Sequence, residues 1–241
     1  MTLSSPHNPR LKFLRQLSNR RRERERTGQF VAEGEDLLAA ADAAGWVPVE
    51  RYVAAGSGLD GLEVEPELLA RASQLGSGTR VLAVYEARWS RPVGPRCVYL
   101  HSVSDPGNVG TVLRSAVAFG AGSVALGPGC ADPYGPKAVR ASMGAIFAAR
   151  VARVAGIEGT PRPRVALAAR GGEPIETLDG EATLVIGAER DGLPPELRAA
   201  CEQTVHIPMT TDAESLNAAM AATIGLYVSS TRGPGHRIGA R

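Results

Sequence analysis

Short runs of aliphatic residues, separated by helix-like stretches, constrain the fold of this chain more than any other sequence feature. In the second half, the runs RCVYLHSV, GSVALG, PRVALAA, ATLVIGA and QTVHIPM are rich in Val, Ile and Leu. Such runs are typical of strands that are buried on both faces, as in a parallel sheet. We expect helices at 109–119, 137–141, 195–201 and 214–229. The pattern therefore predicts an α/β fold with a C-terminal parallel sheet.

The first part of the chain repeats this alternation on a smaller scale. FVAEGEDLLAAADAAGW predicts a strand, a turn at Gly34 and a helix with Leu37 and Leu38 on one side. VERYVAA and TRVLAVYEA resemble strands, and EPELLARASQL resembles a helix that starts near its proline. These elements predict a small α/β domain that contains no catalytic cluster, so its role is expected to be binding.

The stretch EARWSRPVGPR separates the two parts, and its two prolines and three arginines show little periodicity. The predicted boundaries are a first domain over 1–86, a linker over 87–95 and a second domain over 96–241. A chain of 241 residues suits two such unequal domains.

Composition narrows the class of protein. No stretch approaches ~20 uninterrupted apolar residues, and MTLSSPHNPRLKF lacks the apolar region of a secretory signal. Cys97, Cys130 and Cys201 are odd in number and far apart, which favours inert thiols over a disulfide framework or a metal site. We therefore expect a cytoplasmic protein without membrane or metal partners.

The charge is unevenly distributed. The segment 10–26 holds eight basic residues against two glutamates, a local charge of +6 in 17 residues. Because arginine matches phosphate geometry, the segment predicts a helix that binds a polyanion such as a nucleic acid, although a solvated basic helix would have the same pattern. The residues expected to contact the nucleic acid are Arg10, Lys12, Arg15, Arg20, Arg21 and Arg22.

Three loops that follow strands carry polar residues in patterns suited to a site. NVGTVLRSAVAFGA has neither common phosphate-binding glycine signature, and its Arg114 lies off the apolar side of the expected helix. An ordinary exposed arginine would fit the same position. VIGAERDGL places Gly187 and Glu189 just beyond a strand, where Glu189 is either a substrate-orienting carboxylate or a solvated loop acid, and Gly192 suits a tight turn.

The third loop precedes a helix of small residues, within IPMTTDAESLNAAMAA. Ser215 or Asp212 is suited to cap this helix. The smooth helix surface allows close approach by another backbone, from the same chain or from a second subunit. His101 lies near the first loop, where a local hydrogen bond is favoured over a role as base.

In order and spacing, these three segments resemble the three motifs of the SpoU (TrmH-type) RNA ribose 2′-O-methyltransferases, a branch of the SPOUT superfamily. KAVRASMGAIF resembles that family's segment between the first two motifs, and SPHNPRLKFLRQL with TGQFVAEGEDLL resembles its ribosomal-protein-L30e-like substrate-binding domain. The resemblance implies a knotted SPOUT domain with a deep trefoil knot, a homodimer, and S-adenosylmethionine as methyl donor.

The resemblance also assigns residues. It gives catalytic or orienting roles to Asn108, Arg114, Glu189, Ser215 and Asn217. It gives donor-binding roles to Gly187, Ile207 and Leu216, with Ala168 and Met209 nearby. Family members often have small residues where Arg190 and Asp191 follow Glu189, so this chain carries extra charge at its pocket mouth.

The implied reaction is methylation of a ribose 2′-hydroxyl in structured RNA. Arg114 is then either the base or, since arginine stays protonated, the group that fixes a phosphate and stabilises the alkoxide. Large-subunit (23S) ribosomal RNA is favoured as substrate because the first domain suits a folded RNA element. A tRNA methyltransferase, an antibiotic-resistance rRNA methyltransferase and a non-catalytic RNA-binding protein of the same fold remain alternatives.

Overall fold

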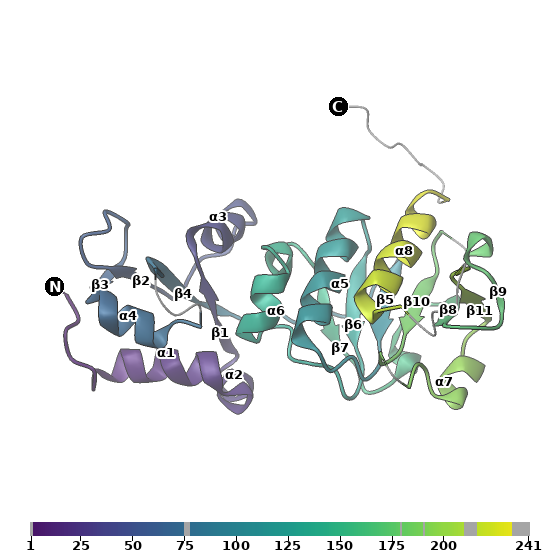
Figure 1. Cartoon of the computed structure of the whole chain (residues 1–241), viewed down its shortest axis with the longest axis horizontal. Coiled ribbons are helices and arrows are strands. Elements are labelled where there is room, and N and C mark those ends of the chain that lie inside the picture. Colours follow the sequence, from purple (N-terminus) through teal and green to yellow (C-terminus); the bar gives the residue numbers. More distant parts are fainter. Residues whose placement is uncertain (1, 75–77, 179, 190, 210–215, 233–241) are drawn as a thin grey trace. The chain divides into compact units, whose positions relative to one another are not determined.

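The computed structural model describes residues 2–74, 78–178, 180–189, 191–209 and 216–232. The chain divides into two compact units (Figure 1). Unit 1 comprises Met1–Arg88 and Asp132–Ala148, and unit 2 comprises Trp89–Ala131 and Ala149–Arg241. The sequence boundaries assign 132–148 to the second domain, whereas in the structure this segment packs with the first unit.

Unit 1 is built on a mixed four-stranded sheet with the order β1-β4-β2-β3. Its strands are β1 (Gln29–Glu33), β2 (Glu50–Ala54), β3 (Leu62–Val64) and β4 (Val81–Glu86). Its helices are α1 (Pro9–Asn19), α2 (Arg21–Thr27), α3 (Glu35–Ala43), α4 (Pro66–Ala72), α6 (Pro136–Ala141) and the short 3₁₀ helix η1 (Ala145–Phe147). The expected turn lies at Gly34, with φ +100°, and Leu37 and Leu38 are buried.

The segment from Asp132 to Ala148 belongs to unit 1 because its side chains complete that unit's core. Phe147 packs edge-on against Trp46 with ring centroids 5.2 Å apart, and the Trp46 Nε1 donates to the Phe147 carbonyl at 2.8 Å. Arg24 Nε lies 2.7 Å from Asp132 Oδ2, and both side chains are only 9% exposed. A chain segment distant in sequence is thus fixed by aromatic packing and by a buried ion pair.

Unit 2 is built on a seven-stranded sheet with the order β7-β6-β5-β10-β8-β11-β9, in which every described pairing is parallel. Its strands are β5 (Cys97–Leu100), β6 (Ser123–Leu126), β7 (Val151–Arg153), β8 (Arg164–Ala168), β9 (Glu173–Pro174), β10 (Thr183–Ile186) and β11 (Gln203–His206). Its helices are α5 (Pro106–Ala118), α7 (Pro195–Ala199), α8 (Ala218–Ser230) and the 3₁₀ helices η2 (Ile157–Gly159) and η3 (Ile175–Thr177). The predicted α/β fold with a parallel sheet is confirmed.

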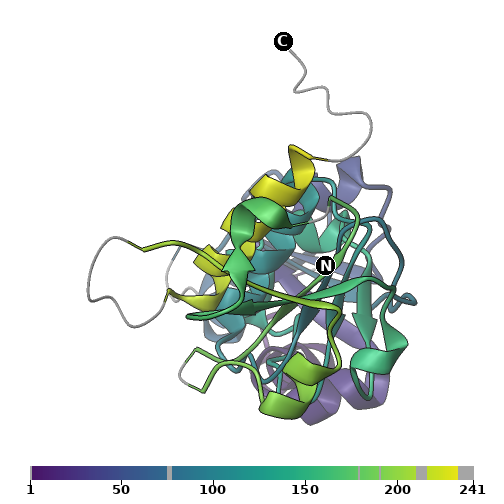
Figure 2. The ribbon, with the colours of Figure 1, turned by 90° about the vertical axis from the view of Figure 1, so that its right-hand side faces the viewer.

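Helices α5 and α8 lie side by side in both ribbon views (Figures 1 and 2). Ser115 Oγ and Thr223 Oγ1 are 2.6 Å apart across this contact. A Cβ on Gly225 would lie 2.5 Å from Leu184 Cδ2, so the glycine lets α8 approach β10 closely. The small residues of α8 therefore serve packing within this chain, one of the two roles that the sequence suggested.

Two sequence expectations differ from the structure in detail. The basic segment forms two helices, α1 and α2, because Arg20 between them has extended backbone angles (φ −126°, ψ 110°). The expected linker is held against unit 2: Val93 N donates to Ser123 Oγ at 2.8 Å, and Gly122 N donates to the Pro95 carbonyl at 2.8 Å. Within the described residues, no helix has the length and apolar character needed to cross a membrane.

The buried ion pair provides a test of how the segment 132–148 is held. Asp132→Ala would leave the Arg24 guanidinium buried without its carboxylate, so we expect a loss of about 3–5 kcal/mol in the free energy of unfolding. Arg21→Ala is the matched control, because Arg21 and Glu25 form an exposed pair whose loss should cost under ~1 kcal/mol. Urea unfolding measures both, and equal effects would contradict the assignment.

Candidate active site at the carboxyl edge of the parallel sheet

The strand order brings several loops of unit 2 to one edge of the sheet. β10 lies between β5 and β8, and β11 lies on the far side of β8. Because these strands are parallel, the chain leaves all four at the same edge, after Leu100, Ala168, Ile186 and His206. In open α/β sheets this edge is where ligands bind.

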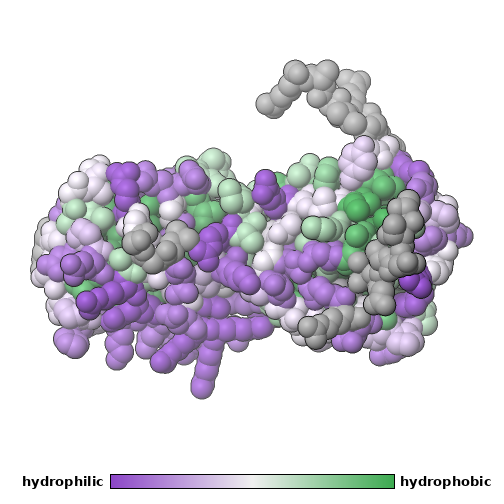
Figure 3. All heavy atoms as spheres, in the orientation of Figure 1, coloured by the Kyte–Doolittle hydropathy of each residue, from purple (hydrophilic) through white to green (hydrophobic). Residues whose placement is uncertain are grey.

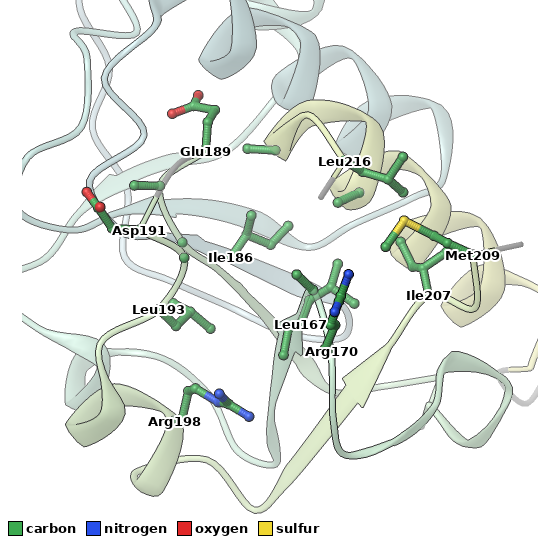
Figure 4. A pocket seen from close by; sticks show the side chains of 17 residues that line it. Leu167, Arg170, Ile186, Glu189, Asp191, Leu193, Arg198, Ile207, Met209 and Leu216 are labelled. Atoms are coloured by element: carbon green, nitrogen blue, oxygen red, sulfur yellow. The ribbon is translucent and has the colours of Figure 1, made fainter. Parts of the chain in front are cut away.

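A cavity of about 330 Å³ opens at this edge (Figure 4). Its volume is in the range of small-molecule sites. Three strand-following loops, α7 and the start of α8 form its wall. The described lining residues are Leu167, Ala168, Ala169, Arg170, Ile186, Gly187, Ala188, Glu189, Asp191, Gly192, Leu193, Arg198, Ile207, Met209, Leu216, Ala218 and Ala221.

All five residues to which the family resemblance assigns donor binding line this one cavity. They are Ala168, Gly187, Ile207, Met209 and Leu216. They come from three strand ends and the approach to α8, so only the fold brings them together.

The backbone of its own loop requires glycine at position 187, in addition to any need for close approach by a ligand. A Cβ there would lie 2.2 Å from the carbonyl carbon of Gly192, since the loop folds back on itself. Gly192 N donates to the Ala188 carbonyl at 3.0 Å, and Gly192 has φ +66°. The tight turn expected at Gly192 is confirmed, and it is this turn that requires glycine at 187.

A chain of hydrogen bonds joins the three sequence motifs beside the cavity. Asn108 on α5 donates from Nδ2 to Glu189 Oε1 at 2.6 Å. Asn217 donates from Nδ2 to Asn108 Oδ1 at 3.0 Å. Of these three, Glu189 lines the cavity itself. The carboxylate is therefore oriented by an amide that is itself fixed by a second amide.

Asn217 is also the N-cap of α8. Its Oδ1 accepts from Ala219 N at 2.9 Å and from Met220 N at 3.3 Å. The expectation that Ser215 or Asp212 caps this helix is corrected, because Asn217 satisfies its first amides; both of those residues lie outside the described residues. One side chain thus fixes the start of the helix and the neighbouring Asn108.

Arg114 lies farther along α5 and is exposed. It lies six positions after Asn108, which corresponds to about 9 Å along a helix. It does not belong to the described lining of the cavity. The structure therefore brings Asn108, Glu189 and Asn217 together, whereas Arg114 lies outside this hydrogen-bonded group.

Three further charged residues line the cavity: Asp191 was expected as extra charge at the pocket mouth, whereas Arg170 and Arg198 were missed from the sequence. Arg170 follows the end of β8, Asp191 follows Glu189, and Arg198 lies on α7. In Figure 4 the two carboxylates lie toward one side of the cavity and the two guanidinium groups toward the other, with Ile186 between Glu189 and Arg170. The position of Arg170 just beyond a buried strand was an available signal, whereas nothing in the sequence marks Arg198.

Burial controls the ionisation of two other groups near the strands. Burial raises the pKa of Tyr99 to about 12, so its hydroxyl stays protonated and lies 3.4 Å from His101 Nδ1. The local hydrogen bond expected for His101 is present. Burial likewise raises the pKa of the Cys201 thiol to about 11. In the described part of the chain, no cluster of three or more His, Cys, Asp or Glu side chains is arranged to hold a metal ion.

The six residues predicted to contact RNA differ in their surroundings. Arg10 pairs with Glu50 at 2.8 Å, and Arg21 with Glu25 at 3.0 Å. Arg15 donates to two backbone carbonyls, those of Leu11 and Pro6. The other three, Lys12, Arg20 and Arg22, are exposed on the hydrophilic surface along α1 and α2 (Figure 3).

Fold and site together define an α/β protein with a small-molecule cavity at the carboxyl edge of a parallel sheet. The SpoU rRNA Methylase family model matches residues 95–227, and the MRM3-like substrate binding domain model matches residues 8–90. The chain belongs to the SpoU rRNA methylase family. The resemblance noted from its three motifs is thereby confirmed.

Individual relatives agree with this assignment. The 23S rRNA (guanosine(2553)-2′-O)-methyltransferase RlmP of Bacillus subtilis is 26% identical, over 93% of this chain and 97% of that protein. The 23S rRNA (uridine(2479)-2′-O)-methyltransferase of Streptomyces viridochromogenes is 38% identical, over 52% of this chain and 48% of that protein. The AdoMet-bound rRNA methyltransferase of Sinorhizobium meliloti is 30% identical, with a TM-score of 0.85 over 95% of this chain and 97% of that one.

The matched share of each relative varies. The chain spans between 28% and 48% of the length of the first curated relatives that it matches.

The double role of Asn217 can be separated by two substitutions. Asn217→Ala removes the cap and the donor to Asn108, and we expect it to lower the free energy of unfolding by about 1 kcal/mol. Asn217→Ser keeps a capping oxygen but loses the amide donor, so it should cost clearly less. Urea unfolding compares them, and equal losses would show that the cap contributes nothing at this position.

Proposed function

We propose that this protein is an S-adenosylmethionine-dependent methyltransferase that methylates a ribose 2′-hydroxyl in ribosomal RNA, specifically in 23S rRNA. The observation that carries the proposal is one cavity lined by Ala168, Gly187, Ile207, Met209 and Leu216, with the Glu189–Asn108–Asn217 chain beside it. Family membership and the names of the Bacillus and Streptomyces relatives support the reaction and the RNA class.

The cavity fits this methyl donor in volume and in chemistry. Aliphatic side chains from Leu167, Ile186 and Leu216 suit an adenine ring, while Asp191 and Arg170 offer opposite charges for the ammonium and carboxylate of an amino acid. When bound, the donor supplies a methyl group on a positively charged sulfur, which needs no further activation. The residues of this chain therefore have to align the ribose hydroxyl with the methyl group and to assist the loss of the hydroxyl proton.

On the acceptor side, Glu189 and Asn108 are proposed to orient the ribose, and Asn217 to hold Asn108. Arg114 is proposed to fix the neighbouring phosphate and to stabilise the oxygen as it loses its proton. Arginine remains protonated in proteins, which favours this electrostatic role over that of base. Ser215 is proposed to complete the polar wall.

Unit 1 is proposed to recognise the folded RNA around the target nucleotide. Its MRM3-like match and the exposed Lys12, Arg20 and Arg22 support this role. Lysine and arginine side chains on an open surface contact phosphates with little sequence preference, so they add affinity and leave the choice of nucleotide to the site.

We further propose a homodimer formed through α5 and α8, a trefoil knot in unit 2 and a cytoplasmic location. The dimer is supported by large apolar side chains that are exposed on these two helices: Val117 is 40%, Tyr227 53% and Met220 62% exposed. Figure 3 shows hydrophobic surface beside α8. Contiguous exposed apolar groups commonly mark a protein interface.

The central catalytic assignment can be tested with Arg114→Ala. Loss of the guanidinium should lower methyl transfer about 100-fold or more, because it removes stabilisation of charge that develops at the ribose oxygen. Donor binding should stay near normal, since Arg114 does not line the cavity. Transfer of labelled methyl to 23S rRNA and calorimetric titration with S-adenosylmethionine measure the two effects.

Arg162→Ala is the control for this experiment, because Arg162 is an exposed arginine of the same unit that pairs with Glu202. It should leave transfer unchanged. Transfer by Arg114→Ala at more than about a tenth of the original rate would overturn the role of Arg114. Failure of the unsubstituted protein to bind the donor would favour a non-catalytic RNA-binding protein, and methylation of tRNA alone would overturn the substrate class.

Arg170 generates a second test, on donor affinity. Arg170→Ala should raise the Kd for S-adenosylmethionine about tenfold, as expected for one charge-assisted hydrogen bond to a carboxylate. Affinity for 5′-methylthioadenosine, which has no carboxylate, should be the same in both proteins. An equal loss of affinity for the two ligands would show that Arg170 shapes the cavity and does not bind the carboxylate.

A further inference from the structure

An exposed tryptophan with an arginine stacked on it lies at one edge of the unit 2 sheet. The Trp89 side chain is 42% exposed. The Arg153 Cζ lies 4.5 Å from the centre of its ring. Arg153 ends β7, the edge strand that is farthest from β9. The catalytic cavity has no part in this arrangement, because β7 and the segment that precedes β5 contribute none of its described lining.

The tryptophan is held in place by its neighbour in the chain. Ser90 N donates to the Val151 carbonyl at 2.8 Å, and Ser90 Oγ donates to the same carbonyl at 3.1 Å. Ser90 also forms an isolated parallel bridge with Ala152. The segment that the sequence predicts to be a linker therefore extends the sheet by one short pairing, and Trp89 directly precedes the paired residue.

Two further arginines lie close in sequence to Trp89 and Arg153. Arg91 and Arg153 each follow the bridged pair Ser90 and Ala152 by one residue, and Arg150 directly precedes β7. All three arginines are exposed. In the described residues, neither Arg91 nor Arg150 has a side-chain hydrogen bond or an ion pair.

Carboxylates are concentrated elsewhere in unit 2. Residues 89–93 and 150–153 contain none. Glu173, Glu176 and Glu202 lie on β9, on η3 and just before β11, toward the opposite edge of the sheet. The two paired segments at this edge of the sheet thus carry three arginines and an aromatic ring but no acid.

We propose that Trp89, with Arg91, Arg150 and Arg153, is a stacking site for an unpaired nucleotide of the RNA substrate. A flat aromatic ring offers a surface on which a base can stack, and neighbouring arginines hold the flanking phosphates. Arg153 alone would account for a partly covered tryptophan, but Trp89 remains 42% exposed and Arg153 adds charge that suits a polyanion. The identity of the ligand as RNA rests on the proposed function.

Intrinsic fluorescence tests the site directly, because the chain has only two tryptophans. Trp46 is 6% exposed and its Nε1 is hydrogen-bonded, so it should respond little to added RNA. A single-stranded RNA of about twelve nucleotides is a suitable probe, in the range of single-strand binding sites. We expect it to quench the emission of the unsubstituted protein, and Trp89→Phe to lose that quenching. Equal fractional quenching in Trp89→Phe would overturn the proposal.

Affinity gives a second measurement with a matched control. Trp89→Ala should weaken binding of the same RNA at least about fivefold, whereas Trp89→Phe should retain part of the affinity. Replacing Arg91, Arg150 and Arg153 with alanine should reduce the slope of log affinity against log salt by about 2. Arg162→Ala, at an exposed arginine elsewhere in unit 2, should change neither quantity. Affinities of Trp89→Ala and Arg162→Ala that agree would overturn the proposal.

Two further outcomes separate this site from the proposed function. RNA quenching and loss of affinity in a protein that transfers no methyl group would support the stacking site while the proposed function failed. Methyl transfer and RNA affinity that are unaffected by Trp89→Ala would overturn the site and leave the function intact. Quenching of Trp89 by polyglutamate as strong as that by RNA would also overturn it, since a peptide anion carries no base to stack.

Discussion

The position of β10 between β5 and β8, with all three strands parallel, is the constraint on which the rest of unit 2 depends. It brings Gly187 and Glu189 to the edge where Ala168 leaves β8 and where α5 begins after β5. An antiparallel β10 would direct its loop to the opposite edge, and neither the cavity nor the Asn108–Glu189 contact could form. The site is therefore a consequence of strand order, and its residues come from segments that are separated by up to 109 positions.

Asn217 contributes both to the stability of α8 and to the positions of the polar side chains beside the cavity. Its Oδ1 caps α8, while its Nδ2 holds Asn108, which in turn donates to Glu189. A single conformation of the Asn217 side chain therefore satisfies the backbone amides at the start of α8 and also holds the Asn108 amide in place. The close packing of Gly225 against Leu184 fixes the rest of α8. These contacts hold the polar groups beside the cavity in fixed positions. Such positioning matters because the main contribution of the protein to the proposed reaction is alignment of the reactants.

The sequence predicts much of the fold, because its aliphatic runs and turn glycines act locally. The strands over Cys97–Leu100 and Thr183–Ile186 and the turn at Gly192 follow from local patterns, while the family of the second domain was indicated by the resemblance of its three motifs. The rest depends on tertiary contacts without local signals. Packing of 132–148 with the first unit depends on the Arg24–Asp132 pair, and the break in the basic helix on the backbone at Arg20. Arg198 enters the cavity from α7, and the sequence around it has no feature of a ligand site.

The most direct test of the central claim is a mass-spectrometric map of ribose methylation in cells with and without the gene. We expect one 2′-O-methyl group to disappear from 23S rRNA when the gene is deleted. It should return with the unsubstituted gene, but not with the Arg114→Ala gene. Identical methylation maps of ribosomal RNA in both kinds of cell would contradict the claim that this cavity serves rRNA ribose methylation.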